Sequence, residues 1–131
     1  MIVMTALLVR VKEVYNAIAA LPEPNSIFEE ISSWIEMTGG PYGGEYNTSD
    51  EIAGGVFANI ASDWANFTFS PEIFMEADGY VFVVGNYTGV NKATGKSLQA
   101  RVVHMWSRKA KGKLCFEQFA DTALLRNAMQ N

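Results

Sequence analysis

The sequence predicts an α+β fold in which helices from the N-terminal half pack on an antiparallel sheet formed by the C-terminal half. Two observations carry this prediction. Apolar residues recur at helical spacing in much of the first half, whereas from Phe67 onward they alternate with a period of two. Turn-forming residues divide the second half into short segments, as in a meander of hairpins. A run of helices followed by a run of strands is typical of α+β proteins.

Length and composition favour an ordered globule. The 131 residues fit a single domain, residues 1–131, that is long enough to bury a core. Hydrophobic residues make up 49% of the chain and the formal charge is −4, so we expect no nucleic-acid partner. The N-terminus lacks a signal-peptide pattern and no apolar stretch approaches the roughly 18 residues of a membrane span. We therefore expect a cytoplasmic protein without membrane contact.

Helical patterns dominate the first elements. Residues 5–20 predict an amphipathic helix that ends at the proline-containing segment 21–24. A second short helix begins near Asn25, and residues 34–37 form a short strand. Residues 39–44 contain four glycines and one proline, which predicts a loop.

A third helix is predicted to begin at Ser49, which serves as its cap. Asp50 and Glu51 then lie in the first turn, where the helix dipole favours negative charge. Inside this helix, the pair Gly54 and Gly55 costs about 1 kcal/mol per glycine relative to alanine. We expect close packing against a strand to explain their presence.

The second half predicts strands joined by turns. Four segments show the pattern of a meander: residues 67–75, 80–87, 97–107 and 114–120. Pro71 inside the first of them indicates an edge strand or a bulge, because proline cannot donate to a central ladder. A short helix begins near Thr122.

The one histidine, His104, lies on the third of these strands, two residues before Trp106. Alternation places both side chains on the more apolar face. A lone histidine there is more often a hydrogen-bonded core residue than a catalyst, and the residue pattern alone leaves both interpretations open.

The partner of His104 on the last strand depends on the hairpin turn. A two-residue turn at residues 111–112 would bring Glu117 and Asp121 to the face of His104, whereas a bulged turn would bring Gln118 inward. Asp121 is equally well explained as the N-cap of the last helix. Glu117 is better explained as an exposed side chain or one paired to Arg101 than as a catalytic residue, since carboxylates are rarely buried alone.

Aromatic residues supply candidate walls for an apolar ligand: Tyr15, Phe28, Trp34, Trp64 and Trp106. Core packing explains each of them as well. Tyr42 differs because glycines flank it on a loop, where it could act as a lid or belong to an ordinary turn. Cys115 and His104 fall short of the ligand count of a zinc site, so we expect no metal.

Several short segments share their order and spacing with one known family: residues 14–17, 40–46, 49–52, 77–79, 81–89, 93–96, 104–106, 112–113 and 119–123. Through them the chain resembles the SnoaL-like, ketosteroid-isomerase-like family of the nuclear transport factor 2 superfamily. The resemblance covers nearly the whole chain. It implies a cone-shaped fold in which N-terminal helices pack on a strongly curved antiparallel sheet, with a hydrophobic pocket at the wide end and a homodimer formed through the outer sheet face.

The resemblance also implies chemistry. Family enzymes generally use no metal or organic cofactor and move protons on an apolar substrate with an Asp or His base and hydrogen-bond donors. Glu36 occupies the strand that carries the isomerase base, but no tyrosine donor is matched. The cyclase branch fits better: His104 matches its histidine as acid or base, with Asp121 or Gln118 orienting it or the substrate.

Two functional hypotheses follow. The first is a small-molecule-binding protein that acts as a cofactor-independent isomerase, cyclase or lyase on an apolar carbonyl or polyketide-like compound. Glu117 and the aromatic walls would then contact the ligand. The second is a non-catalytic dimeric domain that binds a ligand or a protein partner, since one fold hosts many functions.

Overall fold

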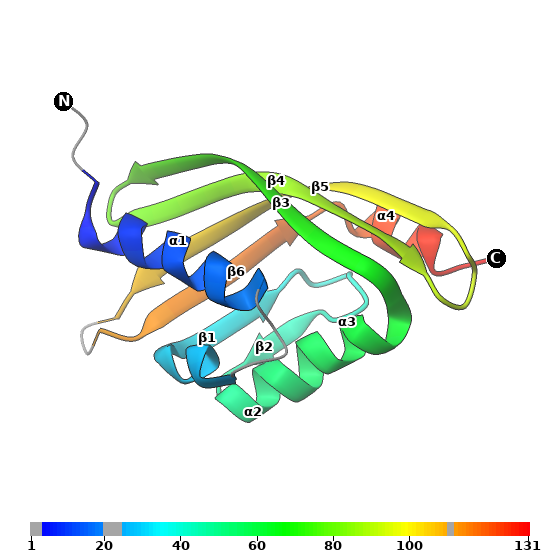
Figure 1. Cartoon of the computed structure of the whole chain (residues 1–131), viewed down its shortest axis with the longest axis horizontal. Coiled ribbons are helices and arrows are strands. Elements are labelled where there is room, and N and C mark those ends of the chain that lie inside the picture. Colours follow the sequence, from blue (N-terminus) through cyan, green and yellow to red (C-terminus); the bar gives the residue numbers. More distant parts are fainter. Residues whose placement is uncertain (1–3, 20–24, 110–111) are drawn as a thin grey trace.

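The computed structural model describes residues 4–19, 25–109 and 112–131, and in it helices pack on one strongly curved sheet (Figure 1). This confirms the α+β prediction. The predicted helix end at residues 21–24 lies outside the described residues.

The helical elements largely follow the predicted order. They are α1 (Ala6–Ala19), the 3-10 helix η1 (Asn25–Glu30), α2 (Ser49–Ile52), the π-helical segment η2 (Ala53–Phe57), α3 (Ala58–Asp63) and α4 (Thr122–Ala128). The elements α2, η2 and α3 follow one another without a break and form one irregular helix below the sheet (Figure 1). The predicted third helix therefore exists, with a π-helical segment in its middle.

The start of this helix and one of its two glycines have identifiable partners. Thr48 is its N-cap, not Ser49 as predicted, because Thr48 has an extended backbone and its hydroxyl accepts a hydrogen bond from the Glu51 amide at 3.1 Å. A Cβ added to Gly55 would lie 2.4 Å from a ring carbon of Tyr46. Close packing against a strand thus explains Gly55, as expected, whereas nothing lies within 4 Å of a Cβ added to Gly54.

Six strands form the sheet: β1 (Ile31–Glu36), β2 (Gly44–Tyr46), β3 (Trp64–Ala77), β4 (Tyr80–Asn91), β5 (Ser97–Arg108) and β6 (Leu114–Ala120). Their spatial order is β2-β1-β6-β5-β4-β3, and the last four form the predicted antiparallel meander. The sheet as a whole is mixed rather than antiparallel because β1 runs parallel to β6. β3 lies at an edge, and its register shifts between Pro71 and Ile73, as the proline predicted.

The register of the last hairpin decides which side chains meet. His104 lies opposite Gln118, and Met105 lies opposite Glu117. The Lys109 amide donates to the Lys113 carbonyl at 2.8 Å, so the loop that these residues close is longer than a two-residue turn. The alternative with Gln118 inward is therefore the one observed.

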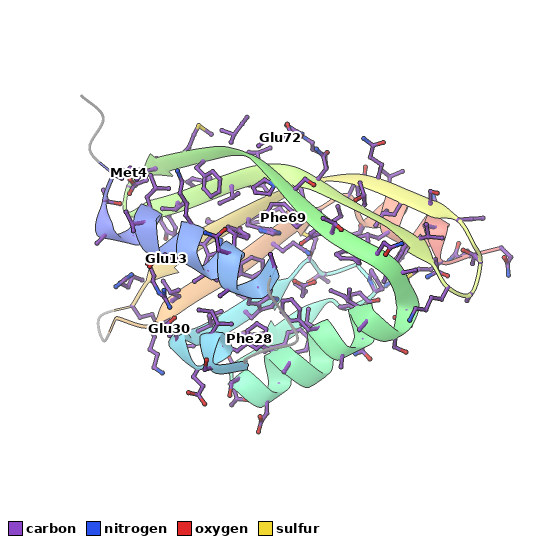
Figure 2. All side chains as sticks on the ribbon, in the orientation of Figure 1. Met4, Glu13, Phe28, Glu30, Phe69 and Glu72 are labelled. Carbon is purple, nitrogen blue, oxygen red and sulfur yellow. The ribbon has the colours of Figure 1, made fainter. Side chains whose placement is uncertain are left out.

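The inner face of the sheet carries two apolar clusters. The larger contains Trp34, Trp106 and Phe116 and packs against α1 and η2. The smaller contains Trp64 and Leu125 beside α4. On β3, Phe69 lies on the side facing α1, whereas Glu72 lies on the outer side (Figure 2). The curvature of the sheet leaves space between these two clusters.

One close approach between strands gives a stability prediction. A Cβ added to buried Gly85 on β4 would lie 2.4 Å from the Ser70 carbonyl oxygen, which belongs to the backbone of β3. We expect Gly85→Val to lower the free energy of unfolding by about 3 kcal/mol, because overpacking forces the strands apart. Urea unfolding followed by circular dichroism measures the change.

The matched control is Gly54→Ala on the irregular helix. Nothing lies within 4 Å of the added methyl group, so alanine should leave stability unchanged or raise it by up to about 1 kcal/mol. Equal urea midpoints for the two variants would contradict the assigned contact.

Candidate functional site

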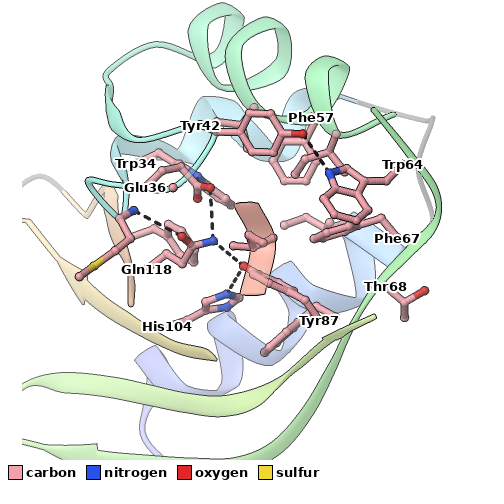
Figure 3. Close-up of a pocket in the computed structure, with 18 of the residues that line it drawn as sticks. Trp34, Glu36, Tyr42, Phe57, Trp64, Phe67, Thr68, Tyr87, His104 and Gln118 are labelled. Carbon is pink, nitrogen blue, oxygen red and sulfur yellow. Dashed lines mark hydrogen bonds between the residues drawn. The ribbon is translucent and has the colours of Figure 1, made fainter. Parts of the chain in front are cut away.

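A cavity of about 740 Å³ lies between the inner face of the sheet, α1, α3 and the glycine-rich loop (Figure 3). Strands β1, β3, β4, β5 and β6 all contribute side chains to its wall, and Leu125 contributes from α4. Most of the wall is apolar. Two separate hydrogen-bonded groups of polar side chains interrupt it, and Asn16, Asn66 and Thr68 also line the cavity.

Most of the residues predicted to form a site line this cavity: Tyr15, Trp34, Tyr42, Trp64, His104, Trp106 and Gln118. Phe28 does not line it. Its ring lies behind the wall, with its centroid 4.8 Å from that of Phe57 and 1% of the residue exposed. Phe28 therefore belongs to the core that supports the cavity.

The structure does not bring the two predicted carboxylates to His104. Asp121 is exposed and caps α4 by accepting a hydrogen bond from the Leu124 amide at 3.2 Å. Glu117 faces the opposite side of the sheet, since its neighbour Gln118 points inward. Neither carboxylate lines the cavity.

His104 holds the centre of the first polar group. Its Nδ1 lies 2.6 Å from the hydroxyl of Tyr15, and its Nε2 lies 2.7 Å from the hydroxyl of Tyr87. Trp106 Nε1 donates to the Tyr15 oxygen at 2.9 Å. Gln118 Nε2 donates to the Tyr87 oxygen at 2.8 Å. Both ring nitrogens of His104 are therefore engaged, and the histidine is 4% exposed.

Glu36, the last residue of β1, joins the same group through Gln118. Gln118 Nε2 lies 3.2 Å from Glu36 Oε1, and Trp34 Nε1 donates to Glu36 Oε2 at 2.9 Å. The Met37 amide donates to Gln118 Oε1 at 3.3 Å, which fixes the orientation of the side-chain amide. One nitrogen, Gln118 Nε2, thus binds both the buried Glu36 carboxyl group and the Tyr87 hydroxyl, as Figure 3 shows.

Burial shifts the acid–base properties of this group. Desolvation raises the pKa of Glu36 from 4.5 to about 7, although the Trp34 and Gln118 hydrogen bonds oppose that rise. Desolvation lowers the pKa of His104 from 6.5 to about 3. It raises the pKa of Tyr15 and Tyr87 well above the usual value. At neutral pH His104 and both tyrosines are uncharged, and Glu36 is poised to exchange a proton.

The second polar group ties the glycine-rich loop to α3 and β3. The Tyr42 hydroxyl donates to Asp63 Oδ2 at 2.7 Å. It also accepts a hydrogen bond from Trp64 Nε1 at 3.0 Å, as Figure 3 shows. From α4, Arg126 donates to the carbonyl oxygen of Gly40 at 3.0 Å. Tyr42 therefore forms an anchored part of the cavity wall, and its action as a lid stays a prediction.

Sequence reasoning missed one member of the first polar group and the polar role of another. Tyr87 was not singled out, although its place on the same alternating face as Val81 and Val83 was a usable signal. Tyr15 was expected only as an apolar wall, because a tyrosine on a helix cannot be matched to a distant histidine by sequence spacing.

No cluster of metal-ligating side chains emerges from the described part of the chain. Among those residues, no three His, Cys, Asp or Glu side chains lie close enough together to hold a metal ion. No helix in the same part is both long and apolar enough to cross a bilayer.

The fold and most of the chain match solved structures. An NTF2-like protein of Burkholderia thailandensis is 36% identical, with a TM-score of 0.83 over 93% of this chain and 96% of that chain. A ketosteroid isomerase-like protein of Catenulispora acidiphila in complex with trimethylamine is 10% identical, with a TM-score of 0.74 over 91% of each chain. A putative SnoaL-like polyketide cyclase of Jannaschia is 13% identical, with a TM-score of 0.74 over 98% of this chain and 97% of that chain.

No family model and no curated protein matches the sequence. The structures from Catenulispora acidiphila and Jannaschia show only a shared fold, because they are only 10% and 13% identical to this chain. The Burkholderia thailandensis protein is similar enough in sequence and length to establish kinship, and the chain therefore belongs to the NTF2-like family, as its resemblance in sequence predicted.

Proposed function

We propose that the chain is a cofactor-independent acid–base enzyme, an isomerase, cyclase or lyase, that acts on a small apolar carbonyl compound. One observation carries the proposal: a carboxyl group with a pKa of about 7 shares the wall of an apolar cavity with tyrosine hydroxyls. A base that removes a proton from carbon works best when its pKa lies near the working pH. A carbonyl oxygen that gains charge needs a hydrogen-bond donor near it.

Glu36 is the base in this proposal. Gln118 Nε2 lies within hydrogen-bond distance of both Glu36 Oε1 and the Tyr87 hydroxyl, so both groups can reach one small molecule. Glu36 takes a proton from the carbon next to the carbonyl, while Tyr15 or Tyr87 donates a hydrogen bond to the carbonyl oxygen. His104 positions the tyrosines and does not take the carbon-bound proton, because tyrosine hydroxyls engage both of its nitrogens.

Exchange of carbon-bound protons for deuterium tests the proposal. We use 2-tetralone, an apolar ketone with acidic C–H bonds, in deuterated buffer and follow its proton NMR signals. The wild-type protein should accelerate the exchange, and Glu36→Gln should return it to the buffer rate. The matched control is Glu45→Gln, since Glu45 is exposed on β2 and does not line the cavity. Equal acceleration by both variants would rule out Glu36 as the base.

A second candidate is a non-catalytic binding protein, which the same cavity supports. Native mass spectrometry of the purified protein would find a retained small molecule in either case. Retention together with no acceleration of 2-tetralone exchange would favour this second function.

We further propose that the chain is one domain and forms a homodimer through the outer face of the sheet. Phe119 and Ile73 are 39% and 44% exposed on the outer side of the meander, where a partner would cover them. Phe119→Lys should convert a dimer to a monomer in sedimentation velocity. A wild-type monomer at micromolar concentration would contradict this proposal.

A further inference from the structure

The hydrogen bonds around His104 leave one hydroxyl proton unused. Trp106 Nε1 and Gln118 Nε2 can only donate, so the oxygens of Tyr15 and Tyr87 accept from them. Neutral His104 carries one N–H group and one bare nitrogen. One tyrosine therefore donates to the bare nitrogen, and the other accepts from the N–H group. The tyrosine that accepts keeps its own proton free.

Two arrangements satisfy this count. In the first, Tyr15 donates to Nδ1, His104 donates from Nε2 to Tyr87, and Tyr87 keeps the free proton. In the second, Tyr87 donates to Nε2, His104 donates from Nδ1 to Tyr15, and Tyr15 keeps the free proton. The distances of 2.6 Å and 2.7 Å are nearly equal, so the geometry permits both tautomers.

The free proton is available to the cavity in both arrangements. Tyr15 and Tyr87 line the cavity, and neither hydroxyl has a further hydrogen-bond partner among the described residues. Phe69 packs on the imidazole ring, with centroids 4.3 Å apart, and Phe116 lies against it at 4.7 Å. These apolar neighbours offer no competing acceptor. The acceptor of the free tyrosine proton is therefore a ligand in the cavity.

We propose that His104 is a tautomeric switch that presents one proton to the cavity at either Tyr15 or Tyr87, and that the ligand is a neutral, enolisable molecule that bridges the two tyrosines. Such a molecule carries one acceptor oxygen and one hydroxyl donor, as the enol of a 1,3-dicarbonyl compound does. This inference rests on the proposed function for its substrate, but the switch itself does not depend on turnover.

When the switch changes from the first arrangement to the second, every proton that is given up is taken up elsewhere. Tyr87 gives its free proton to the acceptor oxygen of the ligand and takes the proton of His104 Nε2. His104 Nδ1 takes the proton of Tyr15, and Tyr15 takes the hydroxyl proton of the ligand. The ligand gains one proton and loses one, and the protein ends in the second arrangement without a charged intermediate. This suits a site whose burial disfavours charge on the histidine and on both tyrosines.

Nitrogen NMR of the empty protein tests the switch directly. The chain has one histidine, so the two imidazole nitrogens give unambiguous signals after ¹⁵N labelling. We expect shifts intermediate between those of protonated and bare nitrogens in the wild type. Tyr15→Phe should lock the proton on Nε2, and Tyr87→Phe should lock it on Nδ1. The control Tyr80→Phe, at an exposed position on β4, should leave the mixture unchanged. A single tautomer in the wild type would overturn the switch.

Benzoylacetone, whose enol absorbs in the near ultraviolet, tests the ligand class. Its addition should shift the tautomer mixture saturably. Tyr15→Phe and Tyr87→Phe should not show that shift. Mixed tautomers that do not respond to benzoylacetone would overturn the ligand assignment. A saturable shift without faster interconversion of enol and ketone would support the switch and its ligand while contradicting the proposed catalytic function.

Discussion

Acidification from pH 6.5 to pH 3 should remove about 5 kcal/mol of unfolding free energy through His104 alone. Burial lowers the pKa of His104 from 6.5 to about 3. The unfolded chain therefore takes up a proton below pH 6.5, whereas the folded protein takes it up only near pH 3. The stabilisation is complete above pH 6.5 and is lost as the pH falls between these values. Urea unfolding at intervals of half a pH unit measures it.

The matched variant for this measurement is His104→Gln. Glutamine still offers one donor and one acceptor to the two tyrosines, but it does not titrate. The difference in unfolding free energy between the wild type and His104→Gln should therefore change with pH only between pH 6.5 and pH 3. In a separate check, the imidazole ¹H and ¹³C shifts of the wild type should stay constant from pH 8 to pH 5. An imidazole that titrates near pH 6.5 would contradict the burial and bonding described for His104.

Local periodicity predicted most of the elements because it depends only on neighbouring residues. The alternation on β5 placed His104 and Trp106 on the inner face correctly, since a strand exposes alternate residues to opposite sides. Pro71 marked the irregular edge strand for an equally local reason. The parallel pairing of β1 with β6 joins segments separated by most of the chain. No local pattern encodes such a pairing.

The candidate site was predicted in part, because two of its features depend on non-local geometry. The choice between Gln118 and its neighbours required the hairpin register, and the turn residues allowed two registers. Tyr15 contacts His104 only because α1 crosses the concave face of the sheet (Figure 1). Asp121 illustrates the converse. Its local role as a helix cap was predicted as an alternative, and the structure places it in that role.

Glu36→Gln should remove a loss of about 3 kcal/mol of unfolding free energy that the wild type undergoes between pH 4.5 and pH 7, and it should abolish proton abstraction. Burial raises the pKa of Glu36 from 4.5 to about 7, so the folded protein resists ionisation of this group. Below pH 4.5 Glu36 is neutral in both the folded and the unfolded state, so it does not lower the free energy of unfolding there. As the pH rises from 4.5 to 7, the unfolded chain ionises first and the free energy of unfolding falls. Glutamine is neutral throughout and avoids that loss.

The two buried groups act in opposite directions where their pH windows overlap. Between pH 4.5 and pH 6.5, acidification weakens the fold through His104 and strengthens it through Glu36. These contributions should largely cancel in the wild type, whose stability should change little over this range. Glu36→Gln should uncover the acid destabilisation caused by His104, and His104→Gln should uncover the acid stabilisation caused by Glu36. If both variants kept the flat profile of the wild type, neither group could have the shifted pKa on which the proposed chemistry depends.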